Sequence, residues 1–376
     1  MAENVVSYRP TEEQDLIRST ARRFLEERIP LERVRELMMS DDGFDRILWK
    51  EMADLGWTGL TIEEELGGAG FGPIELSVLL EEMGRMVTPG PFLASAVIAT
   101  TVIQQIGTAE QQAELLPPLA AGERIATLAL FEGPRQWDPG IAVTSASTDS
   151  GGWVLSGEKR FVLDGHLADT LLVTASGREG MGVFVVSPSA RGVGVTPENV
   201  LDPTRRQATI GLDDVVVGDE ARLGAGDATA ALRRALSLGT TALAAEQVGG
   251  AQRCMEMSVD YAKTRHQFGR PIGSFQAIKH RCANMLMKVE SARSVANHAA
   301  RVTEDEDELA IAAPLAGSIC SDAYVWVAGE NIQVHGGIGF TWEHDAHLYL
   351  KRAKSSSLLL GSPAHQRDLL GRAIGI

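Results

Sequence analysis

Two segments in the C-terminal third of the chain combine cationic, amide and glycine residues in a way that suits a bound anion. The first reads Y-A-K-T-R-H-Q-F-G-R-P-I-G-S-F-Q at 261–276, and the second reads Q-V-H-G-G-I-G-F at 333–340. Each places polar or cationic groups beside a predicted helix end, where glycine lets a phosphate or another backbone approach closely. The segments therefore suit a pyrophosphate-like ligand, although a glycine pair after a helix is also a common helix cap.

The order and separation of these two segments resemble the acyl-CoA dehydrogenase family. The family motifs R-x-x-F-G-x-x-I-x-x-F-Q and Q-x-x-G-G-x-G are both present and begin at Arg265 and Gln333. The resemblance extends over nearly the whole chain. It implies a FAD-dependent oxidoreductase, a flavoprotein that introduces an α,β double bond into an acyl-CoA thioester and passes the electrons to an acceptor similar to electron-transfer flavoprotein.

In that family each FAD lies between two subunits, and the C-terminal motifs of one subunit hold the diphosphate and adenosine half. The resemblance implies that Arg265 and Gln276 contact the diphosphate and that Gln333, Gly336 and Gly337 lie beside the ADP portion. Arginine suits this role because its planar fork of donors meets phosphate oxygens in two-point contacts. The cofactor-binding residues predicted in this way are Arg265, Phe268, Gln276, Gln333, Gly336 and Gly337.

Two segments in the middle of the chain depart from the family pattern. A T-E-P-x-x-G-S-D-like segment is matched by F-E-G-P-R-Q-W-D at 131–138, which keeps only the glutamate and the final aspartate. A W-I-T/S-N-like segment is matched by F-V-L-D at 161–164, so Phe161 replaces the indole that stacks on the flavin ring and Leu163 replaces the hydroxyl near flavin N5. Both changes remove groups that a flavin edge needs as hydrogen-bond partners.

The reaction of the family requires a glutamate that removes the α-proton while hydride leaves the β-carbon. Family members carry it at one of two positions, which are occupied here by Leu360, ahead of Gly361, and by Gly239. Neither side chain accepts a proton. Glu246 follows Gly239 by about two helical turns, roughly 10 Å along the same face. Glu246 is therefore a candidate for a displaced base, with a structural or interfacial role as the alternative.

A complete cofactor half-site, an altered flavin pocket and a missing base together predict a division of labour between unlike subunits. The resemblance is to actinobacterial α2β2 heterotetramers in which a homologous partner carries the base, and it implies a role in lipid metabolism, in steroid or other bulky acyl-CoA catabolism. Two alternatives stay open: a homo-oligomeric flavoenzyme that uses Glu246, and a non-catalytic scaffold or regulatory homologue. Catalytic residues of this chain are left unassigned.

The elements that must position these residues follow from hydrophobic periodicity and predict an α+β multidomain chain. Helical spacing dominates first, short β-rich runs such as 153–155, 170–174 and 183–186 follow, and long helical patterns then return. The predicted domains are an N-terminal helical domain at 1–122, a middle β-domain at 123–225 and a C-terminal helical bundle at 226–376. Helices in the bundle are predicted at 227–263, 274–302, 308–334, 344–356 and 363–373.

Composition narrows the function classes further. The chain has 376 residues and a net charge of -15, which opposes binding to nucleic acid or to an anionic membrane surface. Three widely spaced cysteines, a polar N-terminus and no run of about 18 apolar residues predict a cytoplasmic protein without a membrane span. His344 and His347 suggest no metal site, because a third ligand is lacking.

Overall fold

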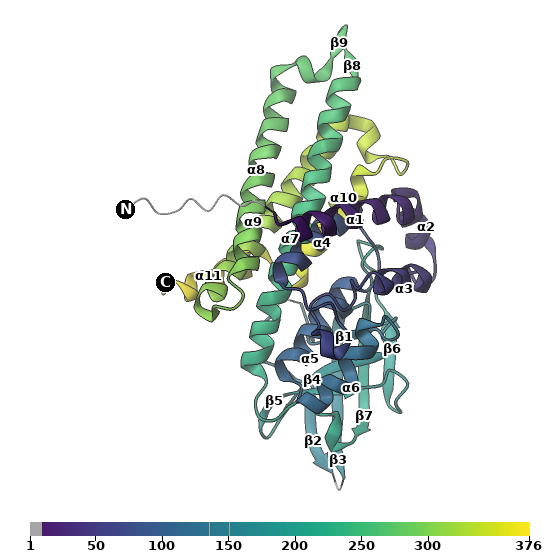
Figure 1. Ribbon diagram of the computed structural model, residues 1–376, viewed down its shortest axis with the longest axis vertical. Coiled ribbons are helices and arrows are strands. Elements are labelled where there is room, and N and C mark those ends of the chain that lie inside the picture. The colour runs from purple at the N-terminus through teal and green to yellow at the C-terminus, as the bar shows by residue number, and fades with distance from the viewer. Residues whose placement is uncertain (1–9, 135, 150) are drawn as a thin grey trace.

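The computed structural model describes residues 10–134, 136–149 and 151–376. These residues form an N-terminal helical domain, a middle sheet domain and a C-terminal helical bundle, so the predicted fold class is confirmed. In Figure 1 the sheet lies at the lower end, the long helices of the bundle reach the upper end, and the N-terminal helices lie beside their junction.

The N-terminal domain is helical because apolar residues recur at helical spacing and several helix starts carry caps. The Thr11 hydroxyl accepts the N–H of Gln14, whose side-chain oxygen accepts the N–H of Thr11 in return. The Asp45 carboxylate accepts the N–H of Ile47. The helical elements are α1 (Glu12–Arg28), α2 (Leu31–Met39), α3 (Arg46–Asp54), η1 (Glu64–Leu66), α4 (Pro73–Arg85), the π-helical η2 (Phe92–Ala99), α5 (Thr100–Ile106) and α6 (Ala109–Ala120).

The middle domain is a seven-stranded, mostly antiparallel sheet in the order β1-β4-β2-β3-β7-β6, with β5 paired to β4. The strands are β1 (Ala126–Ala129), β2 (Ser145–Asp149), β3 (Gly152–Leu163), β4 (Thr170–Gly177), β5 (Gly180–Val186), β6 (Val193–Pro197) and β7 (Gln207–Val217), and the short helix η3 (Asp219–Ala221) follows. Leu163 at the end of β3 pairs with Gln207 at the start of β7. The 198–206 loop therefore leaves the sheet at the same end as the 161–164 segment.

The C-terminal bundle is built around α7, a helix of 36 residues that extends from the sheet domain to the upper end of the molecule in Figure 1. Its elements are α7 (Thr229–Thr264), the hairpin strands β8 (His266–Gln267) and β9 (Arg270–Pro271), η4 (Ile272–Ser274), α8 (Gln276–Arg301), α9 (Glu306–His335), η5 (Gly336–Phe340), α10 (Ala346–Leu359) and α11 (Pro363–Ala373). All five helices predicted from periodicity are present.

Helix α7 also joins the bundle to the N-terminal domain through a close crossing with α4. A Cβ added at Gly84 would overlap the backbone of Glu246, and one added at Gly249 would overlap the backbone of Glu81. Glycine at both positions lets the two backbones touch, which brings the carboxylates of α4 toward the helices of the bundle.

One described helix, with the turn that follows it, is long and apolar enough to cross a membrane. This segment is Glu306–Phe340, and 61% of its most apolar window is buried inside the protein. It comprises α9 and η5, and α9 packs along α7 in the centre of the bundle. Its apolar character is therefore explained by burial in the core.

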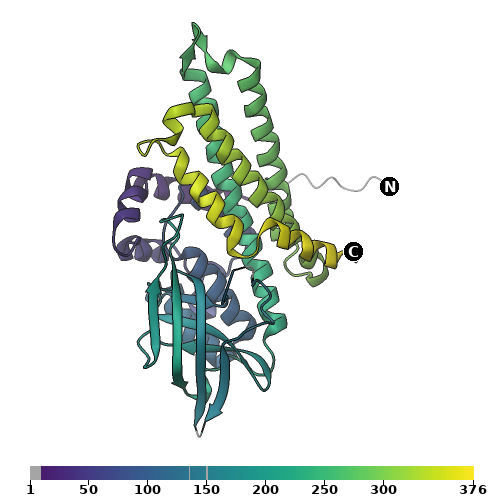
Figure 2. The same ribbon diagram turned by 180° about the vertical axis from the view of Figure 1, so that it is seen from behind.

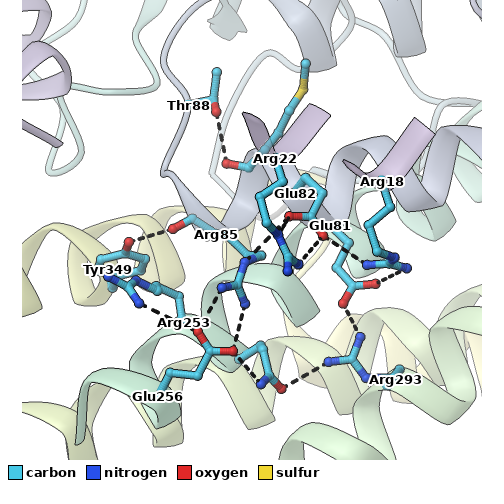
Figure 3. Close-up of polar contacts among 12 residues, drawn as sticks. Arg18, Arg22, Glu81, Glu82, Arg85, Thr88, Arg253, Glu256, Arg293 and Tyr349 are labelled. Carbon is cyan, nitrogen blue, oxygen red and sulfur yellow. Dashed lines mark hydrogen bonds and ion pairs between the residues drawn. The ribbon is translucent and has the colours of Figure 1, made fainter. Parts of the chain in front are cut away.

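A cluster of ion pairs ties α1, α4, α7 and α8 together beside this crossing (Figure 3). The Glu82 carboxylate, almost fully buried, faces three guanidinium groups: Arg22 at 2.8 Å, Arg18 at 3.0 Å and Arg85 at 3.6 Å. Arg85 also pairs with Glu256 on α7 at 2.8 Å. Because Glu82 is buried, its charge is balanced by these cations and hardly at all by water.

We expect Glu82→Gln to lower the free energy of unfolding by about 1 to 3 kcal/mol, since charge-assisted hydrogen bonds are lost while the side chain keeps its size. Thermal unfolding should show the lower Tm. The control is Glu26→Gln, which removes the same charge from an exposed position on α1. Equal Tm values for the two variants would contradict a stabilising role for the cluster.

Candidate functional site

A cavity of about 990 Å³ lies where the three domains meet. Its walls come from η2, the end of β1 with the loop after it, the end of β3, the 198–207 segment, α7 and the C-terminal end of α10. The altered family segments lie in this wall. Lining residues drawn from them are Phe131, Gly133, Pro134, Trp137, Phe161 and Leu163.

The two family positions for the base meet beside this cavity. Leu360 follows the last residue of α10 and lines the cavity. A Cβ added at Gly239 on α7 would lie 3.3 Å from Leu360 Cδ1 and 3.4 Å from Ile98 Cγ1. The two positions are therefore neighbours in space, and neither carries a group that accepts a proton.

Among the described lining residues, the ionisable side chains are Glu198 and Lys354. The Glu198 carboxylate accepts a hydrogen bond from the Thr209 hydroxyl at 2.5 Å and pairs with Arg160 at 3.1 Å. The Thr209 hydrogen bond, with Arg160, holds the pKa of Glu198 below its ordinary value. Lys354 is exposed to solvent. Glu198 is thus a bound, weakly basic carboxylate and a poor candidate for the missing base.

Glu246 lies outside the cavity lining, in a buried ion network. Its carboxylate oxygens accept hydrogen bonds from Arg205 at 2.5 and 2.6 Å and from Arg352 at 2.7 Å. Burial would raise the pKa of Glu246, but the two arginines lower it below its ordinary value. Arg352 also pairs with Asp202 at 2.9 Å and donates hydrogen bonds to the Thr204 hydroxyl. The network argues against Glu246 as a displaced base and for a structural role.

The glutamate retained in the 131–138 segment also has a structural environment. Glu132 pairs with the fully buried Lys159 at 2.7 Å and accepts the backbone N–H groups of Val143 and Thr144. Although burial opposes it, the hydrogen bond from Lys159 and those from Thr144 and Val143 lower the pKa of Glu132 to about 2. Glu132 therefore anchors the loop to the sheet, and its neighbours line the cavity.

Asp164, the last residue of the 161–164 segment, is buried next to the same network. Burial raises its pKa to about 7, against the attraction of Arg205, Arg352 and Arg206. Its backbone N–H donates to the carbonyl of Arg206 at 2.9 Å. Asp164 therefore ties the end of β3 to the 198–207 segment.

Sequence reasoning missed the 198–207 segment, which reads E-N-V-L-D-P-T-R-R-Q. Its ends are joined by a hydrogen bond from the N–H of Glu198 to the carbonyl of Gln207 at 2.8 Å. Near its C-terminal end, Arg205 enters the buried network, and Arg206 donates to backbone carbonyls of the 38–41 stretch of the N-terminal domain. In the local sequence, only the adjacent pair Arg205 and Arg206, shortly after Asp202, could have indicated that this segment takes part in an ion network.

The residues predicted to hold FAD lie at the ends of bundle helices, toward the end of the molecule that is opposite the sheet domain (Figures 1 and 2). Arg265 caps the end of α7, Gln276 begins α8, Gln333 lies in the last turn of α9, and all three are exposed. The ends of α7 and α9 meet through the rings of Tyr261 and His335, whose centroids are 4.4 Å apart. In Figure 1 the β8–β9 hairpin marks the upper end of the molecule, and the ends of α7, α8 and α9 near it are called the upper tip below. The structure therefore gathers these segments and separates them from the cavity.

This upper tip fits a phosphate-bearing ligand. The Arg265 side chain makes no hydrogen bond or ion pair within residues 10–134, 136–149 and 151–376. A Cβ at Gly336 or Gly337 would meet nothing within 4 Å, so space for a ligand lies against the backbone. Gly336 has φ of +63°, a backbone conformation that favours glycine. At Gly337 no described neighbour is close enough to exclude a larger side chain. Phe268, at the hairpin turn, is 91% exposed.

Comparisons with known proteins agree with this architecture. The family model "Acyl-CoA dehydrogenase, N-terminal domain" matches residues 11–123, and "Acyl-CoA dehydrogenase, C-terminal domain" matches residues 228–375. The chain belongs to the acyl-CoA dehydrogenase family. As an acyl-CoA dehydrogenase it has FAD as its cofactor, as the motifs predicted, and the classification as a flavoprotein oxidoreductase is confirmed.

Similar members of the family include relatives of known structure. Acyl-CoA dehydrogenase IpdE2 of Mycobacterium tuberculosis is 35% identical over 96% of both chains. The solved steroid acyl-CoA dehydrogenase Tcur3481-Tcur3483, as a variant, is 34% identical, covers 96% of this chain and 98% of the other, and has a TM-score of 0.88. The ChsE4-ChsE5 complex from Mycobacterium tuberculosis is 30% identical, with coverage of 98% and 99% and a TM-score of 0.90.

Proposed function

We propose that this chain is one subunit of a FAD-dependent acyl-CoA dehydrogenase and acts with a homologous partner that carries the base. The observation that supports the proposal is the contrast between the upper tip of the bundle and the cavity at the junction of the three domains. The upper tip offers Arg265 and the open glycines 336 and 337 to an anion, while Leu360 and Gly239 leave both family positions for the base without a proton acceptor. The tip and the cavity are each half of a site, and they lie at separate places in one chain: the tip at the ends of α7 and α9, and the cavity at the junction of the three domains.

In this proposal the chain binds and orients the cofactor. Arg265 and Gln276 would contact the diphosphate, Arg265 through its fork of donors, and Gln333 would lie beside the ADP portion. Gly336 and Gly337 let the cofactor approach the backbone, and Phe268 extends the contact at the hairpin. Bound FAD would supply the acceptor for the hydride that leaves the β-carbon of the acyl group. The α-proton is taken by a carboxylate of the partner.

The relatives lend support to an assembly of unlike chains. The names of two of the solved structures, ChsE4-ChsE5 and Tcur3481-Tcur3483, each join two different chains, and the second is called a steroid enzyme. We infer a heterotetramer that handles steroid or other bulky acyl-CoA substrates, reduces an acceptor similar to electron-transfer flavoprotein and is located in the cytoplasm. We also propose that the boundaries between the three domains lie near residues 122 and 225.

The two alternatives are disfavoured by specific observations. A homo-oligomeric enzyme based on Glu246 would need that carboxylate to leave two arginines and enter the cavity. A non-catalytic scaffold would have no need of Arg265, whose side chain has no partner among the described residues, at the same tip as two glycines with open space around them. The shared-site proposal accounts for both features.

The isolated chain is expected to purify with little FAD, and the complex with its partner is expected to be yellow. In the complex, Arg265→Ala should weaken FAD binding by about 1.5 to 3 kcal/mol, the usual contribution of a charge-assisted hydrogen bond. Titration of the apo-complex with FAD, followed by flavin fluorescence, measures the loss. Lys263→Ala is the matched control, because Lys263 is a nearby exposed cation that pairs with Asp260 at 3.6 Å. One tightly bound FAD per isolated chain would refute the proposal.

A further inference from the structure

The cavity of this chain has no role in the chemistry if the partner carries the base, and the inference drawn from it rests on that proposed function. The cavity still encloses about 990 Å³, at the upper end of the usual range for small-molecule sites. A space of this size in the interior of a soluble protein loses packing contacts unless something fills it. The chemistry of the residues that line the cavity determines which ligand it can hold.

The deeper walls are apolar and partly aromatic. Trp137, Phe161 and Leu163 face the cavity from the sheet domain, and Leu359 and Leu360 close it from α10. The Thr127 hydroxyl, another part of the lining, donates to the carbonyl of Leu163 at 2.6 Å. These positions therefore offer a ligand mainly apolar surface and few free hydrogen-bonding groups.

The charged side chains among the described lining residues are compensated or lie at the opening of the cavity. Glu198 is bound by Thr209 and Arg160, as described above. Lys354 and Asn199 are exposed, as are the apolar side chains of Leu201 and Leu358, which are 61% and 59% exposed on opposite walls. These exposed lining residues mark the mouth. A charged group deep in the cavity would lack a partner among the described lining residues, which favours a ligand with a neutral body.

The walls are also held in place from behind. The 198–207 wall is fixed by Arg205, which bonds Glu246 and Ser356, and by Asp202, which pairs with Arg352. The loop that carries Trp137 packs on α11, with the indole 5.0 Å from the His365 ring. A fixed apolar cavity favours a rigid ligand, because both partners lose little conformational entropy on binding.

We propose that this cavity is a flavin-independent binding site for a neutral, rigid, polycyclic apolar molecule that bears one polar group at the mouth. The ring system occupies the apolar interior between the sheet domain and α10, and the polar end lies near Asn199 and Lys354. The site binds without turnover, since the carboxylate among its described lining residues, Glu198, is already bound by Thr209 and Arg160.

The test is equilibrium binding of a neutral four-ring steroid ketone to the full chain, followed by calorimetry and by tryptophan fluorescence. We expect saturable binding of one molecule per chain. Leu360→Glu places a charge in the interior and should weaken binding at least about tenfold. Leu358→Glu, at the exposed mouth, is the second variant and should weaken binding several-fold without disturbing the fold. Leu369→Glu is the control, since Leu369 is exposed on α11 outside the lining.

Three results would overturn the inference: no saturable binding, equal binding by the Leu360→Glu, Leu358→Glu and control variants while circular dichroism shows all folded, or displacement of the steroid by FAD. The last result would make the cavity a flavin site. Arg265→Ala serves to separate the two proposals, because it should leave steroid affinity unchanged while it weakens FAD in the complex. If the steroid does not bind while Arg265→Ala still weakens FAD in the complex, the cavity proposal fails. If the steroid binds as expected while Arg265→Ala leaves FAD binding unchanged, the proposed function fails.

Discussion

The chain assayed alone with an acyl-CoA and an artificial electron acceptor is expected to turn over at least about 100-fold more slowly than the complex with its partner. A positioned general base is typically worth about 100- to 10,000-fold in rate. Here the two family positions for that base are Leu360 and Gly239, which lie side by side. The deficit should persist when FAD is added in excess, because added cofactor does not supply a proton acceptor.

The decisive control changes the partner. A partner whose base is changed from glutamate to glutamine should abolish turnover in the complex, although this chain is intact and FAD is bound. If the complex with that altered partner kept its rate, the base would belong to this chain. Activity of this chain alone, lost in Glu246→Gln with an unchanged Tm, would identify Glu246 as that base.

The fold was largely predictable from the sequence because its signals are local. The helix predicted at 227–263 is Thr229–Thr264, and the one predicted at 363–373 is Pro363–Ala373. Helical spacing and helix-ending glycines or prolines are read within a few residues of one another. The runs predicted at 153–155 and 170–174 lie within β3 and β4, and here the sequence underestimated β3, which extends to Leu163.

The environment of Glu246 was beyond sequence reasoning because its partners are distant in the chain. Arg205 lies 41 residues before it and Arg352 lies 106 residues after it. Helical geometry placed Glu246 on the same face of α7 as Gly239, but geometry along one helix does not reveal which residues of other domains face it. The tertiary fold determines this pairing, because it brings the 198–207 segment, with Arg205, and α10, with Arg352, against Glu246.

This network leads to the largest stability effect that we expect. Glu246→Ala leaves two guanidinium groups, of Arg205 and Arg352, buried without their shared carboxylate. Breaking a buried ion pair by removal of one partner typically costs about 3 to 5 kcal/mol, because the remaining charge stays out of water. Chemical denaturation of the variant should therefore show a free energy of unfolding lower by about that amount. Glu290→Ala is the control, since Glu290 is exposed and lies 3.6 Å from Arg293.

The pH dependence of this effect follows from the pKa of Glu246, which the two arginines lower below its ordinary value. A carboxyl group with a lowered pKa in the folded state stabilises the fold above its unfolded pKa and loses that contribution as the pH falls through the folded value. The difference in stability between the native chain and Glu246→Ala should therefore be greatest near neutral pH and shrink on acidification. A difference that is independent of pH would show that Glu246 stabilises the protein through packing alone, and it would remove the buried ion network as the device that holds the cavity wall.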